Sequence, residues 1–159
     1  METAADEKLG VYNVPLREML TYRLSRLNAK MNAQATRILK KSSGLSQAQW
    51  RVLVMIDAFG PVPPAQIVRT SLMDKGQLSR TIKGMVTRGL IRLEASESDH
   101  RSHLLCITDR GRDLFERARP AMLARQTRLS GNLDEGDRAA FHRVLDRLED
   151  AVEAVEAAE

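Results

Sequence analysis

The stretch SESDHRSHLLCITDRG, residues 96–111, concentrates side chains that can do chemistry. It holds two of the three histidines and the only cysteine, together with serines, aspartates and arginines. Side chains of these types serve as nucleophiles, general bases and metal ligands. A catalytic or metal site is therefore the first hypothesis for this stretch.

A hydrolytic triad is the first chemistry that these residues suggest. Asp99, His100 and Ser102 supply an acid, a base and a hydroxyl. A triad, however, requires three groups that converge from fixed positions, and neighbouring residues of one loop point in different directions. The chain also has no nucleophile elbow and no phosphate-binding glycine loop. We therefore predict that the protein is not an enzyme, and we expect no cofactor.

Metal binding and thiol chemistry are two further hypotheses for this stretch. Asp99, His100 and His103 are ligand types, but a structural zinc site takes four ligands, usually with several cysteines, and His142 is distant in sequence. Cys106 stands between apolar residues of an expected strand, a setting typical of a buried structural thiol rather than an exposed redox sensor. We expect no metal site, and a redox role for Cys106 stays open.

The charge pattern favours a polyanion as the partner. Between Gly60 and Leu93 the chain has six cations and one acid, whereas residues 134–159 hold nine acids and three arginines. A basic middle segment suits nucleic acid, and the acidic end is kept away from it. Aromatic residues make up only 4% of the chain, too few for the stacking platforms that bind single strands. The pattern favours double-stranded DNA.

Apolar periodicity predicts the elements that position these charges. Residues 16–39 carry apolar side chains at steps of mostly three and four, typical of one long amphipathic helix ending at KKSSG. A second helix begins after Ser46, whose spacing to Gln49 is that of a capping box. A short helix follows the prolines of GPVPP. Asp74 then caps a polar-faced helix that stops near Gly89.

The second half of the chain reads as a hairpin and two more helices. LIRLEA and HLLCIT are short, β-rich segments joined by the polar loop SESDHRS. Thr108 caps the next helix, in which Pro120 predicts a kink or a joint. After Asp134, apolar residues repeat at steps of four, three, four and three, a seam that suits a partner helix: Phe141, Leu145, Leu148, Val152 and Val155.

A short helix, a turn and a polar-faced helix, followed directly by a hairpin, form a winged helix-turn-helix. The expected fold is mostly α with a small β-hairpin (α+β), with the N- and C-terminal helices forming a dimer domain. We expect an N-terminal dimerisation helix at 1–45, a winged helix-turn-helix DNA-binding domain at 46–110 and C-terminal dimerisation helices at 111–159. We therefore expect the protein partner of this chain to be a second copy of itself, in a homodimer.

The segment DKGQLSRTIKGMVTRGLIRLEASESDHRSHLLCITDRG resembles the recognition helix and wing of the MarR family of bacterial transcription regulators. The wing pattern of Asp99, Arg101 and Ser102, followed by LLCITDRG, is the most specific part of this likeness. The resemblance implies recognition helices in the major groove of each half-site and wings in the flanking minor groove. It also implies a repressor of a palindromic promoter site that a small effector releases, often a phenol or a carboxylate.

The resemblance places the DNA contacts on the recognition helix and the wing. Side chains there donate to base edges and phosphates. The predicted contacts are Lys75, Gln77, Ser79, Arg80, Thr81 and Lys83, with Arg101 at the wing tip and Asp99 as its anchor. For an effector, an arginine beside an aromatic ring suits an aromatic carboxylate. The candidates are Arg17, Tyr22, Arg26 and Trp50.

One hypothesis from a different class stays open, a ligand- or metal-responsive interaction protein of the same fold without specific DNA binding. The excess of cations over acids between Gly60 and Leu93 argues against this hypothesis. No apolar run approaches the about 18 to 20 residues that cross a bilayer, so no membrane partner is expected. The single cysteine suits a reducing compartment, so the expected location is cytoplasmic.

Overall fold

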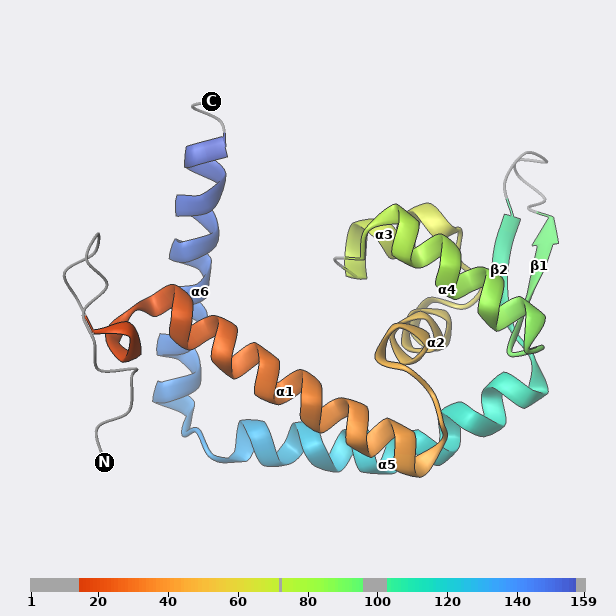
Figure 1. Ribbon diagram of the computed structural model, residues 1–159, viewed down its shortest axis with the longest axis horizontal. Helices are drawn as coiled ribbons and strands as arrows, with labels where there is room; N and C mark the ends of the chain where they lie inside the picture. The colour runs from red at the N-terminus through yellow and green to blue at the C-terminus, as the bar shows by residue number, and fades with distance from the viewer. Residues whose placement is uncertain (1–14, 72, 96–102, 157–159) are drawn as a thin grey trace. The chain divides into compact units, whose positions relative to one another are not determined.

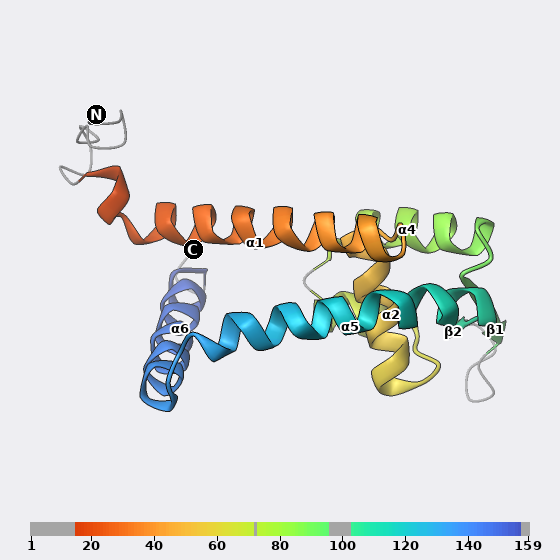
Figure 2. The same ribbon diagram turned by 90° about the horizontal axis from the view of Figure 1, so that it is seen from below.

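The computed structural model describes residues 15–71, 73–95 and 103–156, and its elements follow the predicted order (Figure 1, Figure 2). The fold class is the one predicted, mostly helical with one antiparallel two-stranded hairpin in the described part of the chain. The elements are the 3-10 helix η2 (Leu16–Glu18), α1 (Leu20–Ser42), α2 (Gln47–Phe59), α3 (Pro64–Ser71), α4 (Lys75–Thr87), β1 (Ile91–Ala95), β2 (His103–Ile107), α5 (Asp109–Gly131) and α6 (Glu135–Glu156).

The first helix differs from its prediction at its start and agrees with it at its end. Met19 has an extended backbone, with φ −66° and ψ 122°, so Leu16 belongs to a separate 3-10 turn and α1 begins only at Leu20. At the other end α1 continues to Ser42, and the chain turns at Gly44, whose φ of 71° lies in the left-handed region. The predicted glycine stop is confirmed, and the predicted start at residue 16 is wrong.

Local hydrogen bonds fix the starts of α2 and α4 as predicted. Gln49 N–H donates to Oγ of Ser46 at 3.2 Å, and Ser46 N–H donates to Oε1 of Gln49 at 3.0 Å, so the capping box is complete. Gln77 N–H donates to Oδ1 of Asp74 at 2.7 Å. Such side-chain caps satisfy amide groups that have no partner inside the helix.

Strand β2 of the hairpin forms backbone hydrogen bonds along both of its edges. Its register pairs Ile91 with Ile107 and Ala95 with His103. On the other side of β2, Leu105 N–H donates to the carbonyl of Val62 at 2.8 Å, and Val62 N–H donates back at 3.3 Å. The segment between α2 and α3 is therefore hydrogen-bonded to the hairpin, which fixes the wing against the helix-turn-helix.

One core holds α2, α3, α4 and the hairpin together, and the start of α5 packs into it. Gly111 lies where α5 passes the end of α4: a Cβ atom there would be 2.0 Å from the carbonyl oxygen of Leu90. Thr108 caps α5 as predicted, because Gly111 N–H donates to its Oγ1 at 3.1 Å. Among the described residues, the largest fully buried side chains are Leu39, Val52, Leu53, Val62, Ile67, Met85, Leu90, Ile91 and Leu105.

Helix α5 runs through Pro120 without ending. Contacts nevertheless divide the chain there into two compact units, Met1–Arg119 and Pro120–Glu159, so the division falls at the predicted joint. Proline removes one backbone donor inside the helix, which weakens the helix locally. The domain boundaries predicted at 45/46 and 110/111 stay predictions.

The second unit exposes much of its apolar seam. Asp134 caps α6 as predicted, accepting the N–H of Asp137 at 2.7 Å. Phe141 is 45% exposed and Val152 60% exposed, although their spacing is that of a packed helix face. None of the described helices combines the length and the apolar character that crossing a membrane requires.

Candidate nucleic-acid interface

Helix α4 has one buried face and one polar, exposed face. Leu78 is 2% exposed and Met85 is fully buried, and because they are seven residues apart they anchor the same side of the helix. The residues predicted to contact DNA cover the remaining surface, and five of them are exposed: Lys75, Gln77, Ser79, Arg80 and Lys83. The structure thus brings the predicted helix contacts to one accessible surface. Their roles at DNA stay predictions.

Thr81 differs from the other predicted contacts. It is half-buried, and its hydroxyl donates to the carbonyl of Gln77 at 2.8 Å, one turn back in the same helix. A hydroxyl has one donor and two acceptor positions. The donor of Thr81 is already used, so this side chain has only acceptor positions left for another partner.

Two glycines flank Arg80 on the exposed side of α4. Gly76 precedes Arg80 by four residues and Gly84 follows it by four, so all three lie on one face. A Cβ at Gly76 would lie 3.4 Å from Nη1 of Arg80, whereas at Gly84 it would meet nothing within 4 Å. Each glycine inside a helix costs about 1 kcal/mol relative to alanine. One turn before and one turn after Arg80, the helix surface therefore carries no side chain.

The wing strands carry an ion pair close to their single thiol. Arg92 Nε lies 2.6 Å from Oε1 of Glu94, and Nη1 of Arg92 donates to the carbonyl of Ile107 at 3.3 Å. The hydrogen bond to Glu94 raises the pKa of Arg92. Hydrogen bonds from the Cys106 thiol and from Arg92 lower the pKa of Glu94. Arg92 is thus engaged within the hairpin, and the predicted wing contacts Asp99 and Arg101 lie outside the described residues.

Cys106 is buried, as predicted for a structural thiol, with 4% of its surface exposed. Burial raises the pKa of the thiol, which is the reverse of what a reactive cysteine needs. Among the residues that the structure describes, no group of three or more histidine, cysteine, aspartate and glutamate side chains is placed to hold a metal ion. Asp99 and His100 lie outside that set.

The predicted effector residues separate into two places. A pocket of about 320 Å³ is lined by Arg17, Tyr22, Arg23, Arg26, Leu27 and Lys30, so three of the four candidates meet there. Trp50 is not among its lining residues. The Trp50 ring stacks on that of Phe115, with ring centroids 4.9 Å apart, and packs against the core. The pocket is rich in cations and has one aromatic ring.

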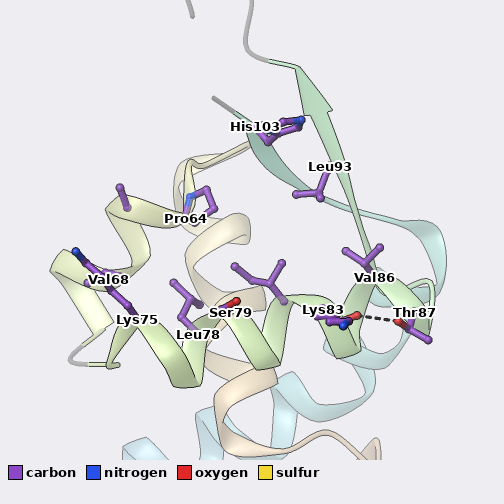
Figure 3. Close-up of a pocket in the computed structure, with 12 residues that line it drawn as sticks. Pro64, Val68, Lys75, Leu78, Ser79, Lys83, Val86, Thr87, Leu93 and His103 are labelled. Carbon is purple, nitrogen blue, oxygen red and sulfur yellow. Dashed lines mark hydrogen bonds between the residues drawn. The ribbon is translucent and has the colours of Figure 1, made fainter. Parts of the chain in front are cut away.

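A larger pocket, which the sequence did not predict, lies between α3, α4 and the hairpin (Figure 3). Its volume is about 670 Å³. It forms because Leu93 and His103 of the hairpin meet α3 and α4, a contact between segments that are distant in sequence. Two of its apolar lining residues, Val86 and Leu93, are 37% and 47% exposed.

Known proteins share the sequence pattern and the architecture of this interface. A model described as the MarR family matches residues 43–102, which contain α2, α3, α4 and β1. A solved structure of the transcriptional repressor CouR bound to a 23-mer DNA duplex is 28% identical to this chain. The match covers 84% of this chain and 94% of CouR, with a TM-score of 0.71.

Two further solved structures show the same fold. The M. tuberculosis regulator MosR in complex with DNA is 24% identical, with a TM-score of 0.69, and the match covers 87% of this chain and 98% of MosR. Bordetella bronchiseptica BpsR, described with regulation of its DNA binding by 6-hydroxynicotinic acid, is 23% identical, with a TM-score of 0.70. That match covers 84% of this chain and 95% of BpsR. No curated protein matches the chain significantly.

Proposed function

We propose that this chain, whose winged-helix segment matches the MarR family, represses transcription by binding a palindromic promoter site as a homodimer. The observation that carries the proposal is the exposed face of α4, where cations and hydrogen-bonding side chains surround Arg80. An α-helix with such a face fits the major groove, where each base pair presents a distinct pattern of donors and acceptors.

The contact roles follow from side-chain chemistry. Arg80 is proposed to bind guanine O6 and N7 with both guanidinium branches, and Gln77 to bind a base edge beside it. Lys75, Ser79 and Lys83 are proposed to donate to phosphates. Thr81 is proposed to accept from a base amino group, because its own donor is bonded to the helix backbone. In the wing, Arg101 is proposed to enter the minor groove with Asp99 as its anchor.

Charge supports pairing of two chains through their terminal helices. Helix α1 contains six cations and no acid: Arg23, Arg26, Lys30, Arg37, Lys40 and Lys41. Helix α6 contains seven acids and three arginines. Opposite charge on the two helices, together with the exposed apolar residues of both, suits a homodimer interface. A dimer presents two copies of α4, which bind half-sites about 34 Å apart or a multiple of that distance.

An aromatic carboxylate is proposed as the releasing effector. The pocket of Arg17, Tyr22 and Arg26 offers guanidinium groups for a carboxylate and a phenol ring for an aromatic body. For BpsR, 6-hydroxynicotinic acid is a compound of this class that regulates DNA binding. The proposed effector site therefore uses three of the four residues predicted from the sequence, without Trp50.

The test is fluorescence-anisotropy titration of the full-length protein on labelled DNA flanking its own gene, with a scrambled duplex as control. We expect saturation at two chains per site, at least about 1,000-fold tighter binding than to the scrambled duplex, and affinity that falls steeply with salt. Equal weak binding to both duplexes contradicts an operator at that locus. No binding at low salt contradicts DNA binding altogether and favours the ligand-responsive interaction protein.

A further inference from the structure

Helix α1 is attached to the winged helix-turn-helix outside its core. Among the residues that the structure describes, no side chain of α1 belongs to the core shared by α2, α3, α4 and the hairpin. The buried residues of α1 are Ala35 and Leu39, both in its C-terminal half. Apolar contact is non-directional, so a small apolar contact leaves the direction of a helix to be set by other interactions.

One side chain of α2 is hydrogen-bonded to α1. The amide nitrogen Nε2 of Gln47 donates to the carbonyl of Asn32 at 2.8 Å and to Oγ1 of Thr36 at 2.7 Å. Gln47 is the first residue of α2, whereas Asn32 and Thr36 lie one turn apart in α1. Both hydrogen bonds therefore cross from one helix to the other, and hydrogen bonds are directional.

A third hydrogen bond prepares the two acceptors. The hydroxyl of Thr36 donates to the carbonyl of Asn32 at 2.9 Å, so its one donor is used and it meets Gln47 as an acceptor. The amide group of Gln47 thus faces two accepting oxygens. Rotating this amide by half a turn would place its own oxygen against them, so the contact permits a single orientation.

The first turn of α2, which carries Gln47, is fixed by its own hydrogen bonds. Ser46 and Gln49 complete its capping box, and Gln49 also accepts from Arg88 at the end of α4. Two glutamine side chains of one turn therefore bond to different helices, Gln47 to α1 and Gln49 to α4. Together they connect α1 to α4.

We propose that Gln47 is a positioning residue, which fixes the direction of α1 relative to the winged helix-turn-helix. With α1 in a dimer interface, this direction sets the distance between the two copies of α4, and hence the separation of half-sites that the dimer binds. The link to half-sites rests on the proposed homodimeric repressor. The positioning of α1 within one chain does not.

Distances in the free protein test the position of α1 without DNA. Nitroxide labels are placed at the exposed positions Ala29→Cys in α1 and Arg69→Cys in α3, in a Cys106→Ala background. After subunit exchange with an excess of unlabelled chain, double electron–electron resonance measures distances within one chain. We expect one narrow distribution. Gln47→Met, which keeps the length of the side chain and removes its donors, should broaden or displace it.

Matched variants separate the hydrogen bond from side-chain bulk. Thr36→Val removes the acceptor and keeps the shape, so it should act as Gln47→Met does, whereas Thr36→Ser keeps the hydroxyl and should behave as the wild type. Combining Gln47→Met with Thr36→Val should add nothing, because both remove the same contact. Thr70→Val is the control: it removes a hydroxyl that donates to the carbonyl of Gln66 inside α3 at 2.9 Å, and it should change no distance.

The second measurement uses operator duplexes whose half-sites are moved one base pair closer or further apart. The wild type should lose about tenfold or more in affinity on each, because the second α4 then misses its bases. In Gln47→Met and Thr36→Val the loss should be about threefold or less, because α1 no longer holds the two copies of α4 at one separation. Lower stability alone reduces the amount of folded protein for every duplex equally and leaves this ratio unchanged.

The outcomes distinguish this inference from the proposed function. An unchanged distribution in Gln47→Met, a broad one already in the wild type, or a change that Thr36→Ser shares would overturn the positioning role. A change confined to Gln47→Met and Thr36→Val, in a protein that binds no duplex, supports the positioning role and removes the repressor proposal. Where the operator is bound, an unchanged preference for one separation in both variants would overturn the link from Gln47 to the half-sites.

Discussion

The guanidinium of Arg88, at the C-terminal end of α4, donates a hydrogen bond of 3.1 Å to Oε1 of Gln49 in the first turn of α2. The same oxygen accepts the N–H of Ser46 at 3.0 Å. One amide side chain therefore completes the capping box of α2 and also holds the end of the helix proposed to enter the major groove. This shared acceptor links the end of α4 to the start of α2.

Gln49→Ala should lower the free energy of unfolding by about 1 kcal/mol, because it removes both hydrogen bonds. Urea unfolding measures the change. Arg88→Ala tests the connection between the helices in a double-mutant cycle, where a coupling energy of about 0.5 kcal/mol or more is expected for residues in contact. Additive effects of the two substitutions would show that the Arg88 bond contributes nothing in solution.

Gly111→Ala should destabilise the fold by about 3 kcal/mol or more. The added Cβ would lie 2.0 Å from the Leu90 carbonyl oxygen and 3.0 Å from Cγ1 of Ile107, so α5 has to move away from the end of α4. Denaturant unfolding gives the magnitude. A loss below about 1 kcal/mol would mean that the start of α5 is not packed as described.

Gly84→Ala is the matched control and has the opposite expected sign. Its Cβ meets nothing within 4 Å, and alanine favours the helix over glycine by about 1 kcal/mol. We therefore expect a gain of up to about that size in the same unfolding assay. A gain in stability that comes with weaker duplex binding would indicate that the glycine is needed where α4 approaches DNA.

Local features of this chain were predictable, because they depend on residues a few positions apart. The capping residues Ser46, Asp74, Thr108 and Asp134 each bond to an amide three residues on, and sequence spacing alone indicates this. The exposed polar face of α4 follows in the same way from helical periodicity. The start of α1 was missed because the extended backbone at Met19 has no such local signal.

Contacts between distant segments were not predictable. The bridge from Val62 to Leu105 and the close approach of Gly111 to Leu90 depend on how the wing packs against the helices. Trp50 illustrates the limit: aromatic character suggested an effector site, but its partner Phe115 lies 65 positions further along the chain. The pocket at Leu93 was missed for the same reason, since its walls come from three elements.

Cys106 should contribute to stability in a way that changes only at alkaline pH. Burial raises its pKa above the ordinary value of 9.0, so the folded state favours the neutral thiol. This contribution is fully present below the ordinary thiol pKa and is lost as the pH rises through the raised pKa of the folded protein. The free energy of unfolding of wild type relative to Cys106→Ala should therefore be constant at neutral pH and fall above about pH 9.

Thiol reactivity gives an independent measurement of the same burial. The native protein should react slowly with a disulfide reagent at neutral pH, and unfolding in guanidinium chloride should raise the rate to that of a free thiol. Fast reaction of the native thiol would contradict the buried position of Cys106 and would revive a redox role.

Arg80→Ala should weaken binding to the operator by about 1–3 kcal/mol and should also relax specificity, because a bidentate contact to guanine distinguishes bases whereas a phosphate contact does not. Arg80→Lys should recover only part of the loss, since an ammonium group cannot make the two-branched contact. Anisotropy titrations on the operator and on duplexes substituted at single base pairs measure both effects.

Lys83→Gln is the comparison: it should weaken binding to all duplexes alike and lower the slope of log affinity against log salt by about one. If Arg80→Ala instead behaved as Lys83→Gln does, Arg80 would be a phosphate contact, and sequence reading would have to lie with Gln77 or the wing.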